Sequence, residues 1–304
     1  MNEEKRERRP VATGIGEVLF DCLPSGMRLG GAPANFAYIA SRLGGKGAVA
    51  SAVGKDDMGR LAGCLLAEKG LEAHLAETDR PTGHVDIALQ AGGVPSYRFA
   101  PDPAYEAIPF TDRLQRLAEE TDICCFGTLA QRGEMTRRTV RRFLAAMRPG
   151  SLRVFDVNLR DGFQEKELVC EMISLSDAVK CNEEELPLLS AFAGLSGVTP
   201  EGYWRFLKKA GVKYFIYTEG EKGSTVYGRG ERSVLPSPPC GAADTVGAGD
   251  SFTAALMTGL YTGLPLPAAH RLAVKTAAFV CTQSGGMPDF PEDAPHWVEE
   301  MKRG

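Results

Sequence analysis

Short runs of consecutive apolar residues, alternating with amphipathic segments, constrain the fold of this chain more than any other feature. Four such runs are ICCFG, LRVFDVN, DAVKCN and KYFIYT, which begin at Ile123, Leu152, Asp177 and Lys213. Continuous apolar strands of this kind are typically buried on both faces. The segment 136–147 has helical spacing of its apolar residues Val140, Phe143, Leu144 and Met147. Strands that alternate with helices predict an α/β fold, in which helices cover both faces of a mostly parallel sheet.

The amino-terminal part of the chain follows the same rhythm. VATGIGEVLF is expected to open as a strand, and a helix is expected over 33–43, ended by the glycine pair that follows it. AVASAVG is expected to be the next strand, followed by a helix near 57–69. No linker divides the chain, so residues 1–304 are expected to form a single domain. The charged residues 1–10 are expected to be a frayed tail.

One segment departs from this alternation. HVDIALQAGGVPSYRFA, residues 84–100, reads as two strands around a Gly-Gly turn. A hairpin inserted into an α/β chain often becomes a lid over an active site. We therefore expect a small β-lid here.

The composition disfavours several classes of function. A net charge of −4 over 304 residues argues against nucleic acid or an anionic membrane as the main partner. No apolar run is long enough to span a membrane, and the charged start MNEEKRERRP has no apolar segment behind it, as a secretory signal would. The eight cysteines lack a C-x-x-C pattern, and the four histidines lack metal-ligand spacing. We therefore expect a cytoplasmic protein with reduced thiols.

The segment DTVGAGDSFTAALMTGL, residues 244–260, carries the clearest chemical signal. Gly247, Ala248 and Gly249 are small and precede a helix that is expected to begin near Asp250. Free amides at a helix start bind anions, and an acid at the same place can accept the proton of an incoming hydroxyl. This combination suits phosphoryl transfer. The alternative is that Asp250 or Asp244 only caps the helix.

The segment LGGAPANFAYIASRLGG, residues 29–45, predicts a tight turn at Gly30 and Gly31 beside Asn35. The Asn35 amide can donate to and accept from sugar hydroxyls, and Asp21 can accept from two of them. The alternative is an ordinary turn with a surface asparagine and a loop acid. The chain contains neither a G-x-x-x-x-G-K-[ST] motif nor a G-x-G-x-x-G after its first strand. A P-loop enzyme and a Rossmann dehydrogenase therefore lose their strongest expected feature.

Together, GGAPANFAYIASRLGG and DTVGAGDSFTAALMTGL resemble the two sequence signatures of the PfkB carbohydrate kinases, the ribokinase-like family, in type, order and separation. The resemblance covers roughly residues 11–290. It implies a ribokinase-like three-layer α/β sandwich with a β-lid formed mainly by about 84–100 and part of 12–35. It also implies ATP as the phosphoryl donor and Mg²⁺ as its counter-charge.

The resemblance assigns roles to single positions. Asp250 matches the catalytic base, and the anion hole matches Gly247, Ala248 and Gly249. The sugar-binding positions match Asp21, Gly30, Gly31 and Asn35. In KCNEEEL, Asn182 and Glu185 resemble the N-x-x-E motif that acts on Mg²⁺ and phosphate through water. The nucleotide-binding T-x-G-x-x-G resembles Thr218, Gly220 and Gly223.

Three further positions follow from the same resemblance. DVNLR offers Asn158 toward the nucleotide and Arg160, whose guanidinium can clamp a phosphate. Asp244 matches an acid that helps to bind a monovalent cation such as K⁺. The chain departs from the family pattern at Val246, where Thr is common, and at Asp289, where Ser is usual.

The runs GEVLFDCLPSGMRLGGAPANFAYIASRLG and SYRFAPDPAYEAI are similar to those of bacterial fructokinases. The expected reaction is therefore phosphorylation of D-fructose at its 6-hydroxyl, with Phe99 and Tyr105 covering the sugar ring. Alternatively, these two aromatic residues only hold the hairpin to the body. Ribose, 2-keto-3-deoxygluconate and nucleosides are alternative substrates within the family.

Two alternatives come from other classes of protein. One is a non-catalytic sugar or nucleotide sensor, which would not need Asp250. The other is a nucleic-acid-binding protein, suggested by Arg137, Arg138, Arg141 and Arg142, although these lie opposite the apolar helix face. The chain is expected to be a monomer or a homodimer paired through its lids.

Overall fold

The four apolar runs form neighbouring strands in the middle of one large sheet. The structure is a computed structural model that describes residues 8–23, 26–89, 95–160, 165–228, 230–239, 241 and 244–303. Within these residues the large sheet has nine strands in the order β13-β12-β11-β10-β9-β8-β1-β4-β5. They are β1 (Val11–Ile15), β4 (Lys46–Gly54), β5 (Glu72–Thr78), β8 (Ile123–Phe126), β9 (Leu152–Asp156), β10 (Ala178–Asn182), β11 (Tyr214–Thr218), β12 (Ser224–Gly228) and β13 (Glu231–Leu235).

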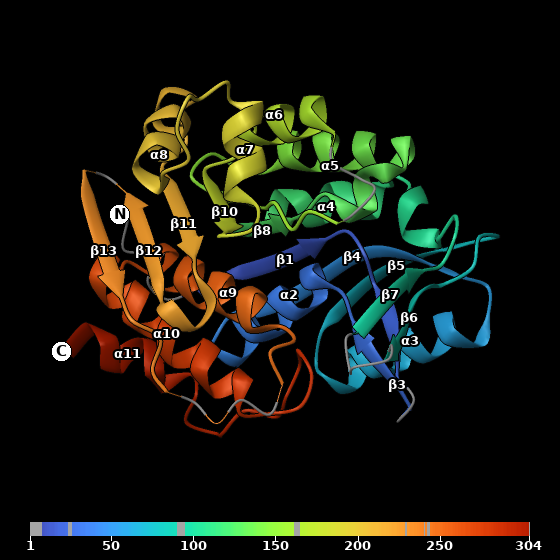
Figure 1. Ribbon diagram of the computed structural model, residues 1–304. Helices are drawn as coiled ribbons and strands as arrows, with labels where there is room; N and C mark the ends of the chain where they lie inside the picture. Colours follow the sequence, from blue (N-terminus) through green and yellow to red (C-terminus); the bar gives the residue numbers. More distant parts are fainter. Residues whose placement is uncertain are drawn as a thin grey trace.

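Strands β11, β10, β9, β8, β1, β4 and β5 are parallel to their neighbours, and β12 and β13 extend the sheet antiparallel. Helices cover both faces, as the α/β expectation requires (Figure 1). One face carries α4 (Asp112–Glu120), α5 (Glu134–Ala146), α6 (Lys166–Ser174), α7 (Leu186–Phe192) and α8 (Pro200–Lys209). The other carries α2 (Ala32–Arg42), α3 (Asp57–Glu68), α9 (Ala248–Tyr261), α10 (Leu266–Cys281) and α11 (His296–Arg303).

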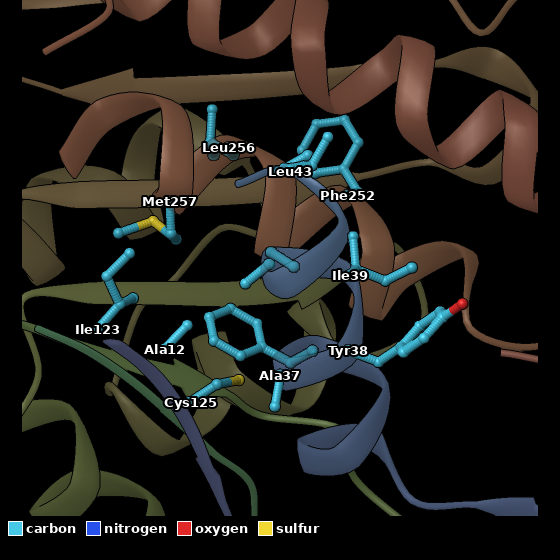
Figure 2. Packing of buried hydrophobic residues seen from close by; sticks show 14 of the residues in the cluster. Ala12, Ala37, Tyr38, Ile39, Leu43, Ile123, Cys125, Phe252, Leu256 and Met257 are labelled. Atoms are coloured by element: carbon cyan, nitrogen blue, oxygen red, sulfur yellow. The ribbon is translucent and has the colours of Figure 1, made fainter. Parts of the chain in front are cut away.

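The apolar strands are continuous because alternate residues enter two different cores. In β8, Ile123 and Cys125 pack toward α2 and α9, whereas Cys124 and Phe126 pack toward α4 and α5. The first of these cores is drawn in Figure 2, where sheet residues meet α2 and α9, with labels on Ala12, Ile123, Cys125, Ala37, Ile39, Phe252, Leu256 and Met257. The same alternation decides which face of the sheet every charged strand residue occupies.

A second, four-stranded sheet lies beside the first (Figure 1). Its order is β3-β2-β6-β7, from β2 (Leu19–Leu23), β3 (Gly26–Gly30), β6 (Gly83–Leu89) and β7 (Pro95–Phe99). These are the segments from which we expected the β-lid, and its Gly-Gly turn lies outside the described residues. The run VATGIGEVLF thus divides at residues 16–18 and contributes one strand to each sheet.

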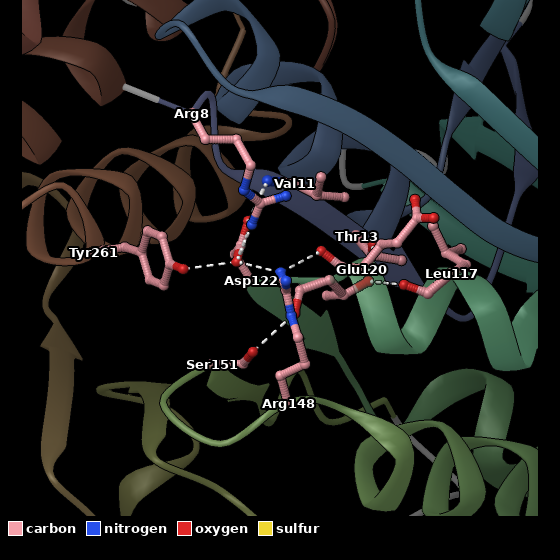
Figure 3. A network of polar contacts seen from close by, with 10 residues as sticks. Arg8, Val11, Thr13, Leu117, Glu120, Asp122, Arg148, Ser151 and Tyr261 are labelled. Atoms are coloured by element: carbon pink, nitrogen blue, oxygen red, sulfur yellow. Dashed lines mark hydrogen bonds and ion pairs between the residues drawn. The ribbon is translucent and has the colours of Figure 1, made fainter. Parts of the chain in front are cut away.

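Asp122, just before β8, ties the start of the described chain to the body (Figure 3). Its buried carboxylate accepts hydrogen bonds from Arg8, Arg148, the Val11 amide and the Tyr261 hydroxyl, at 2.5–2.9 Å. The expectation of a frayed tail over 1–10 is therefore wrong for residues 8–10, because charge-assisted hydrogen bonds hold them. Residues 1–7 lie outside the described part of the chain.

Three sequence-based expectations can be examined beyond the site. The arginines of α5 form a solvated, partnered face, in which Arg137 pairs with Glu165, Arg138 with Glu134 and Arg141 with Glu171, and Arg142 stacks on Phe110. The seven described cysteines form no disulfide with one another. In the described part of the chain, the helices are too short or too polar to cross a bilayer.

Candidate active site

The site lies at the carboxyl ends of the parallel strands β1, β9 and β10. Glu17 follows β1, Asp156 ends β9, and Lys180 lies near the end of β10. The first turn of α9, which begins at Ala248, meets these strand ends with Asp250. Ligands of open α/β sheets bind at this edge, because loops and helix starts converge there.

Asp250 lies in the first turn of α9 and is partly accessible. Its Oδ2 accepts a hydrogen bond of 2.8 Å from Nδ2 of Asn35, which is buried in α2. Poor solvation, with the neighbouring Asp156 carboxylate, raises the pKa of Asp250 to about 6 against the lowering effects of Asn35, Lys180 and Arg160. A carboxylate with this pKa is ionised at pH 7 and can still accept a proton, as a general base must. A residue that only capped the helix would not need these surroundings.

The amide of Asn35 is itself held in place by a contact between two glycine-containing loops. Gly247 has φ 77, a left-handed conformation that favours glycine, and a Cβ there would lie 2.5 Å from Gly286 Cα. A Cβ on Gly286 would in turn lie 2.5 Å from the Asn35 amide. Gly247, Gly286, Asn35 and Asp250 therefore form one chain of close contacts.

Lys180 and Asp156 form a buried ion pair beneath this turn. They are direct partners in the register of β9 and β10, and Lys180 Nζ lies 3.0 Å from Asp156 Oδ1. A Cβ on Gly249 would lie only 3.2 Å from Lys180 Nζ. Burial disfavours the charged form of Lys180, but Asp156, Glu185 and Asp250 outweigh it and hold its pKa above the ordinary value.

Glu17 is a further buried acid at this edge. It is 2% exposed, and among the described residues no group hydrogen-bonds its Oε2. Burial raises its pKa to about 7, and the charges of Asp250 and Asp156 act in the same direction. Glu17 therefore adds a further acid within electrostatic reach of Asp250 and Asp156.

The expected sugar-binding residues lie beside this centre. A Cβ on Gly30 would lie 2.9 Å from Asp21 Oδ2, and one on Gly31, whose φ is 118, would lie 2.3 Å from the carbonyl oxygen of Glu17. The two glycines therefore let Asp21 and the Glu17 loop approach the start of α2. Asn35 also belongs to this group, but here it donates to Asp250.

Asp244 holds two loops and the small sheet together. Its carboxylate accepts from the Val246 amide at 3.0 Å and the Gly285 amide at 3.1 Å, and it pairs with Arg28 of β3 at 3.2 Å. Arg28 therefore pairs with the acid that the resemblance assigned to a monovalent cation, and that assignment stays a prediction. Burial and the nearby Asp244 raise the pKa of Asp21. The charges of Arg160 and Arg28 lower it, by a smaller amount.

Glu185 and Asn182 organise the end of β10. Glu185 is buried, and its two oxygens accept from the amides of Leu159 and Asn182 at 2.7 and 2.9 Å. The Asn182 side chain accepts from the amides of residues 184 and 185. Both side chains therefore shape the loop, and their expected action on Mg²⁺ stays a prediction.

The remaining expected positions lie at neighbouring strand ends. Thr218 ends β11, and Gly220 opens the short helix η3 (Gly220–Lys222) with φ 53. Gly223 has φ 126, and a Cβ there would lie 2.3 Å from the carbonyl oxygen of Leu235. Asn158, after β9, has φ 43, which is unusual for a residue other than glycine.

Arg160 is exposed and follows Asn158 in the loop after β9. Its charge lowers the pKa of Asp250 and Asp21, so it lies within electrostatic reach of both acids.

Tyr105 is buried in a small apolar cluster between the small sheet and the body. It belongs to η1 (Ala104–Ala107), is 1% exposed, and packs with Leu19, Val85, Leu129 and Ala130, with Phe99 at the edge of the cluster. A Cβ on Gly83 would lie 2.4 Å from its ring. This packing favours the alternative role, and the expectation that Tyr105 covers the sugar stays a prediction. Its ring holds the small sheet to the body.

Glu17, Asp156 and Lys180 were missed from the sequence, although a signal was present. Asp156 and Lys180 are charged residues inside apolar runs that are buried on both faces. A charge in such a strand has to be paired, because burying it alone is costly. The runs LRVFDVN and DAVKCN therefore predict an ion pair if they are neighbouring strands. Glu17 carries a weaker signal, an acid between two apolar strands.

Comparisons with known proteins show the family of this chain. The model of the pfkB family carbohydrate kinases matches residues 23–293. A fructokinase from Klebsiella pneumoniae is 30% identical over 298 residues, which cover 91% of this chain and 95% of that protein. A sugar kinase from Pyrococcus horikoshii is 32% identical over 302 residues, which cover 92% and 93%.

Solved structures give the same result. The crystal structure of a sugar kinase from Pyrococcus horikoshii in complex with ATP has a TM-score of 0.78 at 29% identity, and covers 96% of this chain and 99% of that one. A ribokinase II from E. coli has a TM-score of 0.81 at 21% identity, covering 96% and 99%, and supports the ribokinase-like fold. This chain belongs to the pfkB family of carbohydrate kinases.

Proposed function

We propose that this kinase transfers the γ-phosphate of ATP to the 6-hydroxyl of D-fructose, with Asp250 as the general base. The observation that carries the proposal is the pairing of Asp250 with Asn35 beside the glycine turn of α9. An ionised acid of matched pKa next to the amides of a helix start suits an alcohol that attacks a phosphoryl group. The relatives named fructokinase support the choice of sugar.

The sugar is held by acceptors that the site provides. Asp21 offers a carboxylate, and Asn35 offers Oδ1, which is buried and hydrogen-bonded by no group in the described part of the chain. A buried acceptor without a partner suits a sugar hydroxyl, which would donate to it. Its Nδ2 meanwhile orients Asp250 toward the same hydroxyl.

The phosphoryl group is received by the amides of Gly247, Ala248 and Gly249. Asp250 takes the proton of the 6-hydroxyl as its oxygen forms a bond to the γ-phosphorus and the bond to the β,γ-bridging oxygen breaks. General-base assistance is worth about 10²–10⁴-fold in rate. Positioned amides stabilise the charge on the transferred group by a further ~3 kcal/mol.

The nucleotide is assigned to the strand ends of Thr218, Gly220 and Gly223, with Mg²⁺ bound mainly through its phosphates. In the described residues, three acids, histidines or cysteines do not converge as a metal cage. That fits Mg²⁺, which keeps several waters and takes few protein ligands. Asn182 and Glu185 would hold those waters, and the ion supplies positive charge to the phosphates.

The test is a coupled ADP-release assay with Mg-ATP on a panel of fructose, ribose, 2-keto-3-deoxygluconate, glucose and adenosine. The proposal expects fast turnover with fructose alone, and a product phosphorylated at the 6-position by NMR. Asp250→Asn serves as the control for the mechanism. Fast turnover with another sugar of the panel and none with fructose would overturn fructose as the substrate. The assignment as a kinase would stand. Silence across the panel in a protein that still binds ATP would favour a non-catalytic sensor.

A further inference from the structure

We infer that Lys180 is a positioning residue of this phosphoryl transfer, whose ammonium group, held by Asp156, keeps the Asp250 carboxylate ready to accept a proton. The inference rests on the proposed role of Asp250 as the base. Lys180 does not need to touch either substrate for this role, since it acts through the acid above it.

The position of Lys180 follows from the sheet. In β10, Val179 and Cys181 face the core of α6 and α7, so strand alternation turns Lys180 toward the face of α9. Asp156 has the same parity in β9 and is its direct register partner, which explains the 3.0 Å ion pair. The contact with Gly249, where a Cβ would meet Nζ at 3.2 Å, fixes the ammonium beneath the first turn of α9.

A cation is an unexpected neighbour for that turn. The start of a helix carries partial positive charge, so a buried lysine beneath it opposes the helix dipole. Such an arrangement is favourable only where negative charge collects. Here Asp156 and Asp250 supply two charges, and the phosphoryl group would add more. Residues that disfavour local stability in this way are expected at functional sites.

Asp250 is surrounded by charged and titratable groups on several elements. Among the acidic groups, Asp156 raises the pKa of Asp250. The charge of Asp250 in turn raises the pKa of Glu17 and of the Cys125 thiol. The neutral Asn35 amide lowers the pKa of Asp250 by donating a hydrogen bond to its carboxylate. The positive charges of Lys180 and Arg160 lower it as well. Arg160 is exposed and screened by solvent, so Lys180 is the buried positive charge among these groups.

The test is a cycle of variants read through the pH dependence of kcat/KM, whose acid limb reports the base of the free enzyme. Lys180→Met should move the acid limb upward by about one pH unit, which lowers the rate about fivefold at pH 6 and leaves it nearly unchanged at pH 9. Asp156→Asn should move the limb downward. The double variant Lys180→Met/Asp156→Asn removes both charges and should return the limb near its wild-type position.

The matched control is a lysine–aspartate pair at the other end of β10. Lys213, before β11, pairs with Asp177, before β10, at 2.6 Å. Lys213→Met removes a lysine–aspartate pair that is remote from Asp250, so it should leave the acid limb in place. If Lys180→Met fails to fold because Asp156 is left unpaired, Asp156→Asn and the double variant still carry the test.

The outcomes separate the two proposals. A limb that lies at the same pH in Asp156→Asn and in the double variant overturns the role of Lys180, because removing the lysine then has no effect. So does a limb that moves in Lys213→Met as far as it does in Lys180→Met. Loss of rate that is the same at every pH would identify a structural role instead, and also overturns it. If wild-type protein phosphorylates no sugar, the proposed function fails first. If the wild-type protein phosphorylates a sugar and Asp250→Asn does not, the proposed base stands, and the pH cycle then tests the role of Lys180 alone.

Discussion

Two acids at opposite ends of the same sheet have opposite surroundings. Asp122, at the amino end of β8, accepts from two arginines, a tyrosine and a backbone amide. Asp250, at the carboxyl edge, receives one side-chain hydrogen bond, from Asn35, and has Asp156 and Glu17 as acidic neighbours. The Asp122 carboxylate thus has several hydrogen-bond donors, whereas the Asp250 carboxylate has one side-chain donor.

The difference separates anchoring from chemistry. A carboxylate with several donors is stable as an anion and ties distant segments together. A carboxylate with few donors and like-charged neighbours keeps a raised pKa, so it can take up and release a proton near neutral pH. We therefore expect the same residue type to serve stability at Asp122 and, as proposed, reactivity at Asp250.

The largest expected effect is on activity at Asp250. Asp250→Asn should lower kcat by about 10²–10⁴-fold, because the amide cannot accept the proton. Its melting temperature at pH 8 should be equal to or above that of the wild type, since a poorly solvated charge is removed. Steady-state kinetics and thermal unfolding measure the two effects. Wild-type kcat in this variant would end the assignment of the base.

Asp122→Ala should show the reverse pattern. It should cost about 2–4 kcal/mol of unfolding free energy, because several charge-assisted hydrogen bonds are lost together. The kcat of the folded protein should be unchanged, since Asp122 lies at the other end of the sheet. Urea denaturation and kinetics on the same preparation measure both. A large loss of kcat without loss of stability would remove the distinction between the two ends.

Glu17→Gln tests whether the buried Glu17 carboxylate, at the carboxyl edge of the sheet, lowers the free energy of unfolding. The pKa of Glu17 is raised from its ordinary value of 4.5 to about 7, so the folded protein favours the protonated form. That contribution is complete below pH 4.5 and is lost as the pH rises through 7. Glutamine resembles the protonated acid, so the variant should be more stable than wild type at pH 8, by about 1–3 kcal/mol, and equal to it at pH 4.5. Equal differences at both values would contradict the raised pKa.

The smallest effect is expected at Arg8. Its side chain is half-exposed, and Asp122 keeps Arg148, Tyr261 and the Val11 amide when Arg8 is removed. Arg8→Ala should therefore cost about 1 kcal/mol or less in urea denaturation. A loss as large as that of Asp122→Ala would mean that the donors to Asp122 act as one unit, so that the remaining donors cannot compensate for the loss of Arg8.

The sequence predicted the sheet better than it predicted the site. The runs at 123–127, 152–158, 177–182 and 213–218 became β8, β9, β10 and β11, because strand burial is a local pattern of side chains. The helix expected over 136–147 is α5. Asp250 could be named from its segment because a helix start and its chemistry are also local.

The contacts of the site could not be predicted in the same way. The bond from Asn35 to Asp250 joins residues that only the folded sheet brings together, and Asn35 was expected to face the sugar alone. The burial of Tyr105 depends on how the small sheet packs on the body. The pairing of Lys180 with Asp156 depends on strand order and register, which the apolar pattern leaves open.

The contact between Asn35 and Asp250 also decides when the protein becomes active during its synthesis. The two residues are 215 positions apart, and the Tyr38 hydroxyl in the same helix bonds the carbonyl of Pro288, 250 positions away. A nascent chain can pair β1 with β4 and β8 early, but its base and the partner of that base meet only after α9 has left the ribosome. Pairings of such long range form slowly. A partly synthesised chain therefore lacks the means to consume ATP, and this kinase should acquire its activity in a single late step.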